Sequence, residues 1–145
     1  MQLRYKRFEE LTLQELYEIL QLRVNVFVVE QNCAYEDLDS RDQDALHVWL
    51  EDEEGIEAYL RIMDRGVVSP YVSIGRVIAC KRRQGLATEL LKEAIVIARK
   101  EFQADKIYLE AQVYAKSLYE KLGFVQVSEE FLEDGIPHIR MLKEL

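Results

Sequence analysis

The sequence predicts an α/β fold, more closely an α+β arrangement of one mixed sheet with helices, and three observations lead to this expectation. Short apolar runs of strand composition alternate with segments whose apolar residues recur at helical spacing. Two such runs flank the acidic stretch 51–55, whose turn chemistry makes the flanking strands antiparallel. The run 71–80 leads through a basic turn into a helix and then into the run 106–111, and a connection of this length implies a right-handed parallel crossover.

The chain begins with a short, partly alternating strand at residues 3–8, followed by a helix. Thr12 and Glu15 predict a capping box, in which each side chain accepts a hydrogen bond from the other residue's backbone N–H. The end of this helix is left open, because β-branched residues enter the apolar pattern at 23–30. The polar, acidic stretch 31–44 then predicts a loop.

The rest of the chain alternates strands with two further helices. The expected strands are 45–50, 56–63, 71–80, 106–111, 124–131 and 138–142. Helices are expected over 86–101 and 115–122, where Gly123 ends the second, and a turn at 133–137 joins the last two strands. No linker, repeat or low-complexity segment interrupts this order, so residues 1–145 are expected to form one domain.

The composition is that of an ordinary soluble globular protein, with 49% hydrophobic and 32% charged residues. A net charge of -8 argues against general nucleic-acid binding, which needs an excess of Lys and Arg facing phosphates. No apolar run is long enough to cross a bilayer, and residues 1–11 lack the apolar core of a signal peptide, so no membrane association and a cytoplasmic location are expected. Cys33 and Cys80 fit no metal or redox spacing and are expected as reduced thiols, without a metal site.

The basic turn 81–85 joins an apolar strand to the start of a helix. The first N–H groups of a helix have no internal partner, and the helix dipole adds partial positive charge there. Gly85 lacks the Cβ that would block close approach of a ligand. These features predict a site for a phosphate or pyrophosphate group, and a solvated basic turn is the alternative interpretation.

Two motifs resemble the signatures of one superfamily. Residues 82–87, Arg-Arg-Gln-Gly-Leu-Ala, fit the pattern Arg/Gln-x-x-Gly-x-Gly/Ala, and residues 115–124, Ala-Lys-Ser-Leu-Tyr-Glu-Lys-Leu-Gly-Phe, follow after one short strand. In this order the two motifs resemble the GNAT superfamily of acetyl-CoA-dependent N-acetyltransferases. The segments 23–33 and 133–138 resemble the ElaA-type branch of that superfamily. The resemblance implies the GNAT acyl-CoA N-acyltransferase fold, a mixed and mostly antiparallel sheet flanked by helices.

The resemblance also implies acetyl-CoA as co-substrate. Backbone N–H groups at 83–87 would hold the pyrophosphate, and the strand before the loop would diverge from its parallel neighbour, so that main-chain groups at 77–79 bind the pantetheine amides. Gln112 stands where many GNAT proteins have Asn, seven residues before the tyrosine of the second motif. The implied cofactor-binding residues are Val77, Ile78, Ala79, Arg82, Arg83, Gln84, Gly85, Leu86, Ala87, Thr88, Gln112, Ser117 and Tyr119.

Direct aminolysis of a thioester needs a neutral amine, stabilisation of the carbonyl oxygen and a proton for the departing thiolate. By resemblance, Tyr119 is the general acid beside the sulfur, and the backbone N–H of Ile78 is the candidate for polarising the carbonyl. The alternatives are an ordinary buried tyrosine on an amphipathic helix and, for Ile78, core packing. The general base is left open among Glu110, Glu30 and His138, each able to act directly or through water.

The candidate acceptor-binding residues are Glu30, Arg76 and His138, with Glu110 as a further one. For the charged residues the alternative is an ordinary ion pair or a solvated surface charge, and for His138 it is a histidine that starts a strand. The acceptor itself, a small-molecule or peptide amine, is left open, and the acidic balance favours a cationic one.

Three functions compete. The two motifs predict an enzyme that transfers the acetyl group of acetyl-CoA directly to a primary amine. A non-catalytic acyl-CoA-binding or regulatory module on the same fold is the alternative. A nucleotide-binding protein of another class is disfavoured, because the sequence has no Gly-x-x-x-x-Gly-Lys-Ser/Thr or Gly-x-Gly-x-x-Gly run. Homodimers are common in the superfamily, so a homodimer is one assembly to expect.

Overall fold

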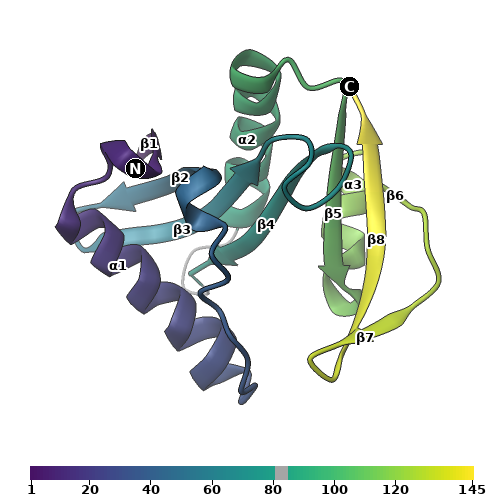
Figure 1. Cartoon of the computed structure of the whole chain (residues 1–145), viewed down its shortest axis with the longest axis horizontal. Helices are drawn as coiled ribbons and strands as arrows, with labels where there is room; N and C mark the ends of the chain where they lie inside the picture. Colours follow the sequence, from purple (N-terminus) through teal and green to yellow (C-terminus); the bar gives the residue numbers. More distant parts are fainter. Residues whose placement is uncertain (81–84) are drawn as a thin grey trace.

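A computed structural model of the chain, which describes residues 1–80 and 85–145, contains one mixed sheet (Figure 1). Its strands lie in the order β1-β2-β3-β4-β5-β8-β6, and β7 also pairs with β8. The strands are β1 Gln2–Arg7, β2 Ala45–Asp52, β3 Gly55–Met63, β4 Val72–Ala79, β5 Lys106–Gln112, β6 Val125–Gln126, β7 Phe131–Glu133 and β8 Ile136–Glu144. Neighbouring strands are antiparallel except β4 and β5, so the predicted fold class and the parallel pairing of these two strands are confirmed.

The helices among the described residues are α1 Leu13–Arg23, α2 Leu86–Phe102 and α3 Lys116–Lys121, with short 3-10 segments at Phe8–Glu10, Asp42–Asp44 and Val113–Ala115. None of these helices is long and apolar enough to span a membrane. The predicted capping box is confirmed, because Glu15 N donates to Thr12 Oγ1 over 3.0 Å and Thr12 N donates to Glu15 Oε1 over 2.9 Å. The stretch that the sequence left open continues α1 as a π-helix, Val24–Glu30.

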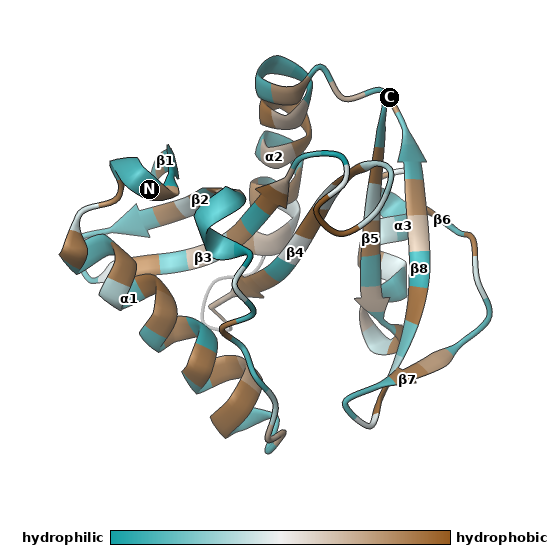
Figure 2. Cartoon of the chain, viewed as in Figure 1, coloured by the Kyte–Doolittle hydropathy of each residue, from teal (hydrophilic) through white to brown (hydrophobic). Residues whose placement is uncertain are grey.

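Two hydrophobic clusters cover opposite faces of the sheet. Val48 and Leu60 pack in the larger cluster with α2, and their neighbours Trp49 and Tyr59 pack with Ile19 of α1. Adjacent side chains of a strand point to opposite faces, so these central strands supply both clusters. Figure 2 shows the hydrophobic residues that run along α2 and the adjoining strands β3 and β4.

β4 contains one extra residue near the middle of the sheet. Arg61 pairs with Gly75, but Tyr59 pairs with Ile78, so three steps along β4 match two along β3. Arg76 lies in this bulge with a left-handed φ of 55°. A β-bulge bends its strand and increases the local twist, so β4 changes direction here.

β4 and β5 pair only near their first residues. Val72 pairs with Ile107 and Ser73 pairs with Tyr108, and the register stops there although β4 continues to Ala79. The two strands then diverge, as Figure 1 shows. The divergence that the family resemblance implied is therefore present.

The predicted strand 124–131 is wrong as a single strand, because the structure has two short ones, β6 and β7, that both pair with β8. Between them Arg140 N donates to Ser128 Oγ over 2.9 Å, so a side-chain oxygen takes the place of a ladder carbonyl. The predicted turn at 133–137 is also shorter. Its central residues are Asp134 and Gly135, which both have positive φ, as a tight hairpin turn requires.

Candidate active site

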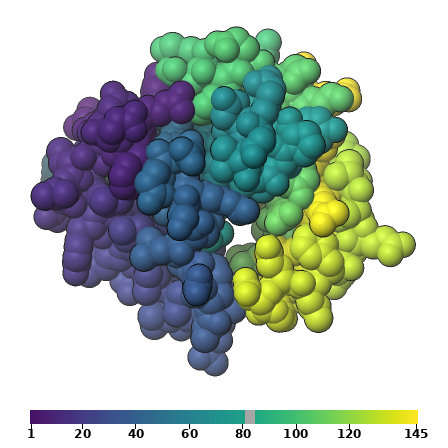
Figure 3. All heavy atoms as spheres, in the orientation of Figure 1, coloured from purple at the N-terminus to yellow at the C-terminus, as the bar shows by residue number. Residues whose placement is uncertain are grey.

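A cavity of about 480 Å³ opens where β4 and β5 diverge. Val77 of β4, Gln112 of β5, Tyr119 of α3 and His138 of β8 contribute to its wall, and Tyr35 of the segment 31–44 lies on another side. Figure 3 shows the molecular face hollowed between that segment, in blue, and the β7–β8 hairpin, in yellow-green. The cavity therefore joins parts of the chain that are far apart in sequence.

The β3–β4 ladder fixes the direction of the backbone groups at the end of β4, where Val77 lines the cavity. Cys80 N donates to Glu57 O over 2.8 Å, in line with the register that pairs Tyr59 with Ile78. Hydrogen-bonded and non-bonded pairs alternate along an antiparallel ladder. Tyr59 and Ile78 are therefore the next hydrogen-bonded pair, and their N–H and C=O groups face each other.

This register corrects the role predicted for Ile78. Its N–H is directed at Tyr59, so it cannot polarise a carbonyl in the cavity, and its side chain packs in the α1 cluster, as the core-packing alternative states. The N–H and C=O of a trans peptide point in opposite directions. The C=O of Val77 and both backbone groups of Ala79 therefore face away from β3, toward the side from which β5 has diverged. An extended ligand with amide groups can bond to them as an added strand would.

Tyr119 brings a phenol to the cavity from α3. Its side chain is buried, and its ring packs edge to face on Phe124 with 5.9 Å between the ring centroids. Gly123 ends the helix with a φ of 93°, which turns the chain so that Phe124 N donates to Tyr119 O over 3.1 Å. Burial, with a smaller contribution from Tyr114, raises the pKa of Tyr119, so the hydroxyl stays protonated at neutral pH and is available as a proton donor.

The start of α2, whose residues are not among the described ones that line the cavity, provides backbone donors that have no partner inside the helix. Gly85 is the N-cap residue with a φ of 82°, and Glu89 N donates to Gly85 O over 3.0 Å as the first helical hydrogen bond. The N–H groups of Leu86, Ala87 and Thr88 precede that bond and have no partner within the helix. The other residues predicted for the phosphates, Arg82, Arg83 and Gln84, lie outside the described residues.

Gln112 and Ser117, both predicted to contact the cofactor, lie in different places. Gln112 borders the cavity, and its Nε2 donates to Gln31 Oε1 over 3.3 Å. Ser117 is exposed on α3 and is not among the described residues that line the cavity. Of this pair, the structure brings only Gln112 to the cavity.

The residues predicted to bind the acceptor also lie in different places. Glu30 is exposed at the end of the π-helix and is not among the described residues that line the cavity. Arg76 reaches the cavity, but its Nε donates to Asp37 Oδ1 over 2.9 Å, so its charge is already paired. Glu110 borders the cavity and accepts a hydrogen bond of 2.7 Å from the hydroxyl of Tyr108.

His138 lies beside Gln112, its pairing partner in β5, and is 8% exposed. Its Nδ1 is 2.7 Å from the backbone oxygen of Ile136, and its Nε2 is 3.6 Å from Glu133 Oε2. The imidazole stacks on Phe131 with 6.1 Å between the ring centroids. The ring is therefore held on three sides, and it borders the same cavity as Tyr119.

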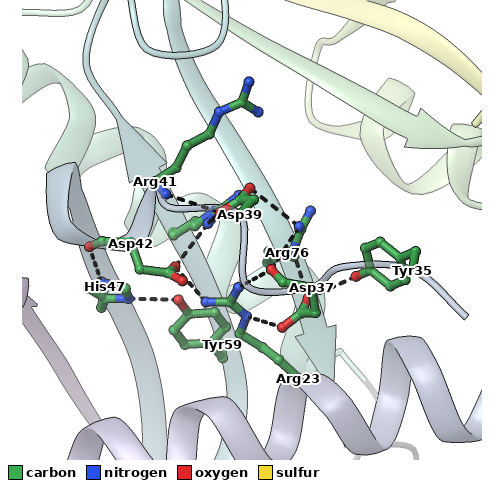
Figure 4. A network of polar contacts seen from close by, with 10 residues as sticks. Arg23, Tyr35, Asp37, Asp39, Arg41, Asp42, His47, Tyr59 and Arg76 are labelled. Carbon is green, nitrogen blue, oxygen red and sulfur yellow. Dashed lines mark hydrogen bonds and ion pairs between the residues drawn. The ribbon is translucent and has the colours of Figure 1, made fainter.

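A buried ion-pair network, which the sequence did not predict, holds the acidic segment 31–44 on the sheet (Figure 4). Arg23 is fully buried, and its Nε donates to Asp37 Oδ2 over 3.0 Å. Asp42 accepts from both Arg23 and Arg61, and Asp39 accepts from Arg61 over 2.9 Å. The only signal in the sequence is the presence of arginines inside two otherwise apolar stretches.

The charges of this network stabilise one another. Burial alone would raise the pKa values of Asp39 and Asp42. The hydrogen bonds and charges of arginines outweigh it and lower both, those of Arg61 for Asp39 and those of Arg23 and Arg61 for Asp42. Burial lowers the pKa of His47, whose Nε2 lies 3.0 Å from the carbonyl oxygen of Asp42 and whose Nδ1 lies 2.7 Å from the Tyr59 hydroxyl. The network thus fixes the segment that forms one wall of the cavity.

A mixed sheet whose parallel pair diverges around a cavity is the arrangement of the acyl-CoA N-acyltransferase fold. Residues 11–145 match the family model of the acetyltransferase (GNAT) domain. The chain belongs to the GNAT acetyltransferase family, in the branch that contains ElaA and the UPF0039 proteins.

The relatives agree over nearly the whole chain. A UPF0039 protein of Schizosaccharomyces pombe is 41% identical over 145 residues, which cover 97% of this chain and 95% of that protein. The crystal structure of an acyl-CoA N-acyltransferase from Pseudomonas aeruginosa is similar with a TM-score of 0.92, at 39% identity and 99% coverage of both chains. The crystal structure of Escherichia coli ElaA is similar with a TM-score of 0.91, at 35% identity and 99% coverage of both chains.

Proposed function

We propose that this chain is an N-acetyltransferase that transfers the acetyl group of acetyl-CoA directly to a primary amine. The observation that carries the proposal is the cavity, where the unpaired edge of β4 and the protonated phenol of Tyr119 meet. Membership of the GNAT family and the similarity to an acyl-CoA N-acyltransferase at 39% identity support it.

Each part of the site has a role in this proposal. Bound acetyl-CoA would supply a thioester whose acyl carbon is open to attack by an amine. The backbone groups of Val77 and Ala79 would orient the pantetheine arm, and the N–H groups at the start of α2 would face the pyrophosphate. Tyr119 would give its hydroxyl proton to the sulfur as the C–S bond breaks.

Calorimetry with acetyl-CoA, followed by acetylation assays on a panel of amines, tests the proposal. The panel would hold spermidine, glucosamine, free lysine and a peptide with an unblocked N-terminus. Binding together with acetylation of at least one amine is the expected result. Absence of acetyl-CoA binding would contradict the proposal, and binding without transfer to any amine would favour the non-catalytic acyl-CoA-binding module.

Tyr119→Phe tests the role of the phenol. The ring and its contact with Phe124 are kept while the proton donor is lost, so kcat should fall by about 100-fold and the Kd for acetyl-CoA should stay nearly unchanged. Tyr17→Phe, at an exposed position on α1, is the matched control and should behave as wild type. An unchanged kcat in the Tyr119 variant at every pH would remove this residue as the acid.

A further inference from the structure

We propose that His138 is the general base that takes the proton of the attacking amine through its Nε2, and that Glu133 stabilises the imidazolium that results. This inference rests on the proposed function, because it places the amine at the His138 side of the same cavity. It rests on four features: the orientation of the imidazole, its carboxylate neighbour, its position across the sheet from Tyr119, and the placement of the other candidate bases.

The hydrogen bond of His138 fixes which ring nitrogen is free. The backbone oxygen of Ile136 can only accept, so Nδ1, at 2.7 Å, must carry a proton and donate it. In the neutral ring Nε2 is then the nitrogen with the lone pair. It lies 3.6 Å from Glu133 Oε2, beyond hydrogen-bond distance, on a ring that borders the cavity.

Glu133 suits the charged product of proton transfer. It lies at the end of β7, pairs with Ile136 across the hairpin and is half exposed at the cavity edge. Burial and then the negative charges of Glu110 and Asp134 raise its pKa, while a positive charge on His138 acts in the opposite direction. A proton on Nε2 would therefore relieve this accumulation of negative charge and be stabilised by it.

His138 and Tyr119 reach the cavity from opposite faces of the sheet. Tyr119 belongs to the hydrophobic cluster on the α2 side, together with Ile139, the residue next to His138 in β8. Side chains alternate along a strand, so His138 points to the other face. An acyl carbon held in the opening between β4 and β5 would have the base on one side and the acid on the other.

The proton balance of the transfer then closes. The amine nitrogen bonds to the acyl carbon as Nε2 of His138 takes one of its protons, and the C–S bond breaks as Tyr119 gives its proton to the sulfur. The products are an amide and the free thiol. The proton on His138 returns to the Tyr119 oxygen through water, which restores both side chains.

The other two candidate bases are less well placed. Glu110 already accepts a hydrogen bond of 2.7 Å from the Tyr108 hydroxyl, and Arg140 Nε lies 3.9 Å from its carboxylate. Glu30 is exposed and is not among the described residues that line the cavity. His138 is therefore the candidate that borders the cavity and whose basic atom has a fixed orientation.

The chain's two histidines allow a test that needs neither a variant nor a substrate. His47 Nε2 faces the carbonyl of Asp42, so His47 must carry its proton on Nε2, whereas His138 must carry it on Nδ1. Long-range ¹H–¹⁵N correlation spectra of the labelled protein, recorded where imidazole is neutral, should show one ring of each tautomer. Two rings with the proton on Nε2 would overturn the proposal.

The roles of His138 and Glu133 are tested by steady-state kinetics of variants, measured with the best acceptor found in the amine panel. His138→Asn keeps an amide N–H that can donate to Ile136 O but removes the basic nitrogen, so kcat should fall by about 100-fold with the Kd for acetyl-CoA unchanged. Glu133→Gln should lower kcat by about 10-fold, and Glu133→Asp should restore part of the loss. Glu130→Gln, at an exposed position three residues away, is the matched control and should keep wild-type kinetics.

The outcomes separate this inference from the proposed function. Wild-type acetylation with an unaltered rate in His138→Asn would overturn the role of His138 and leave the proposed function standing. Equal losses in Glu133→Gln and Glu133→Asp would overturn the role of the Glu133 charge. If the wild-type chain binds no acetyl-CoA, the proposed function fails, and the base assignment that rests on it fails with it.

Discussion

Arg23 illustrates how single residues hold the walls of the site. Its guanidinium is fully buried between α1 and the segment 31–44, where Asp37 and Asp42 accept its hydrogen bonds. Burying a charge costs several kcal/mol unless its partners are well placed. Removing one carboxylate therefore destabilises the fold, because it leaves a buried arginine charge without its partner. Asp42 has a double role, because it also accepts from Arg61.

At this scale we expect Asp42→Asn to destabilise the protein by about 3 kcal/mol, because it leaves two buried arginines with one carboxylate fewer. Urea unfolding monitored by the fluorescence of Trp49, which is buried in the α1 cluster, measures the effect. Asp44→Asn, an exposed neighbour, serves as the control and should change the unfolding free energy by less than about 0.5 kcal/mol. Equal stability of the two variants would contradict the importance of the network.

Among the elements, β4 decides the shape of the cavity. Its bulge places Arg76 in a left-handed conformation, which side chains with a Cβ adopt at a cost of roughly 1–2 kcal/mol. The side chain has a compensating contact, since it donates to Asp37, and its guanidinium lies 5.4 Å from the centre of the Tyr35 ring. The strained residue is thus held by the segment that closes the cavity.

The strain is measurable by comparing two variants that lose the same contacts. Arg76→Gly should be more stable than Arg76→Ala by about 1 kcal/mol, because glycine adopts a φ of 55° without penalty. The same pair at Val125, an exposed residue of β6 with ordinary strand conformation, should show the opposite order. Chemical denaturation of the four variants checks this, and a more stable alanine variant at position 76 would show that the bulge is not strained.

The buried titratable groups make the folding stability of the whole molecule sensitive to acid. The lowered pKa of His47 means that the unfolded chain takes up a proton first as the pH falls below about 6.5, so folding stability decreases there. The pKa values of Asp39 and Asp42 are also lowered by folding, so the unfolded chain takes up these protons first as the pH falls below about 4, and the folding stability decreases further. Glu133, whose pKa is raised, acts in the opposite direction.

We therefore expect the unfolding free energy to decline in two stages on acidification, with one onset below about pH 6.5 and another below about pH 4. Urea titrations at a series of pH values measure the profile. His47→Gln should remove the first stage and leave the second, and Asp39→Asn should reduce the slope of the second only. A wild-type stability that rises on acidification from neutral pH would contradict this assignment.

The amino-acid order was sufficient to predict the parts of the fold that local chemistry specifies. The Thr12 capping box, the antiparallel strands around the acidic turn and the end of α3 at Gly123 were predicted, because each depends on residues close together in the chain. The parallel pairing of β4 and β5 was predicted from the length of the connection through α2. The two family motifs led to the acetyltransferase family in the same way. Predictions on Arg82, Arg83 and Gln84 stay predictions.

Which residues meet at the cavity depends on the three-dimensional arrangement of the strands and loops. The bulge at Arg76 and the ladder register turn Val77 and Ala79, rather than the N–H of Ile78, toward the opening between β4 and β5. The acidic segment 31–44, which the sequence predicts as a polar loop, is held by ion pairs with Arg23 of α1 and Arg61 of β3. Such features depend on contacts between residues that are distant in the sequence. They also depend on which residues of a strand form the hydrogen-bonded pairs with its neighbour. Neither property produces a local pattern in the amino-acid order.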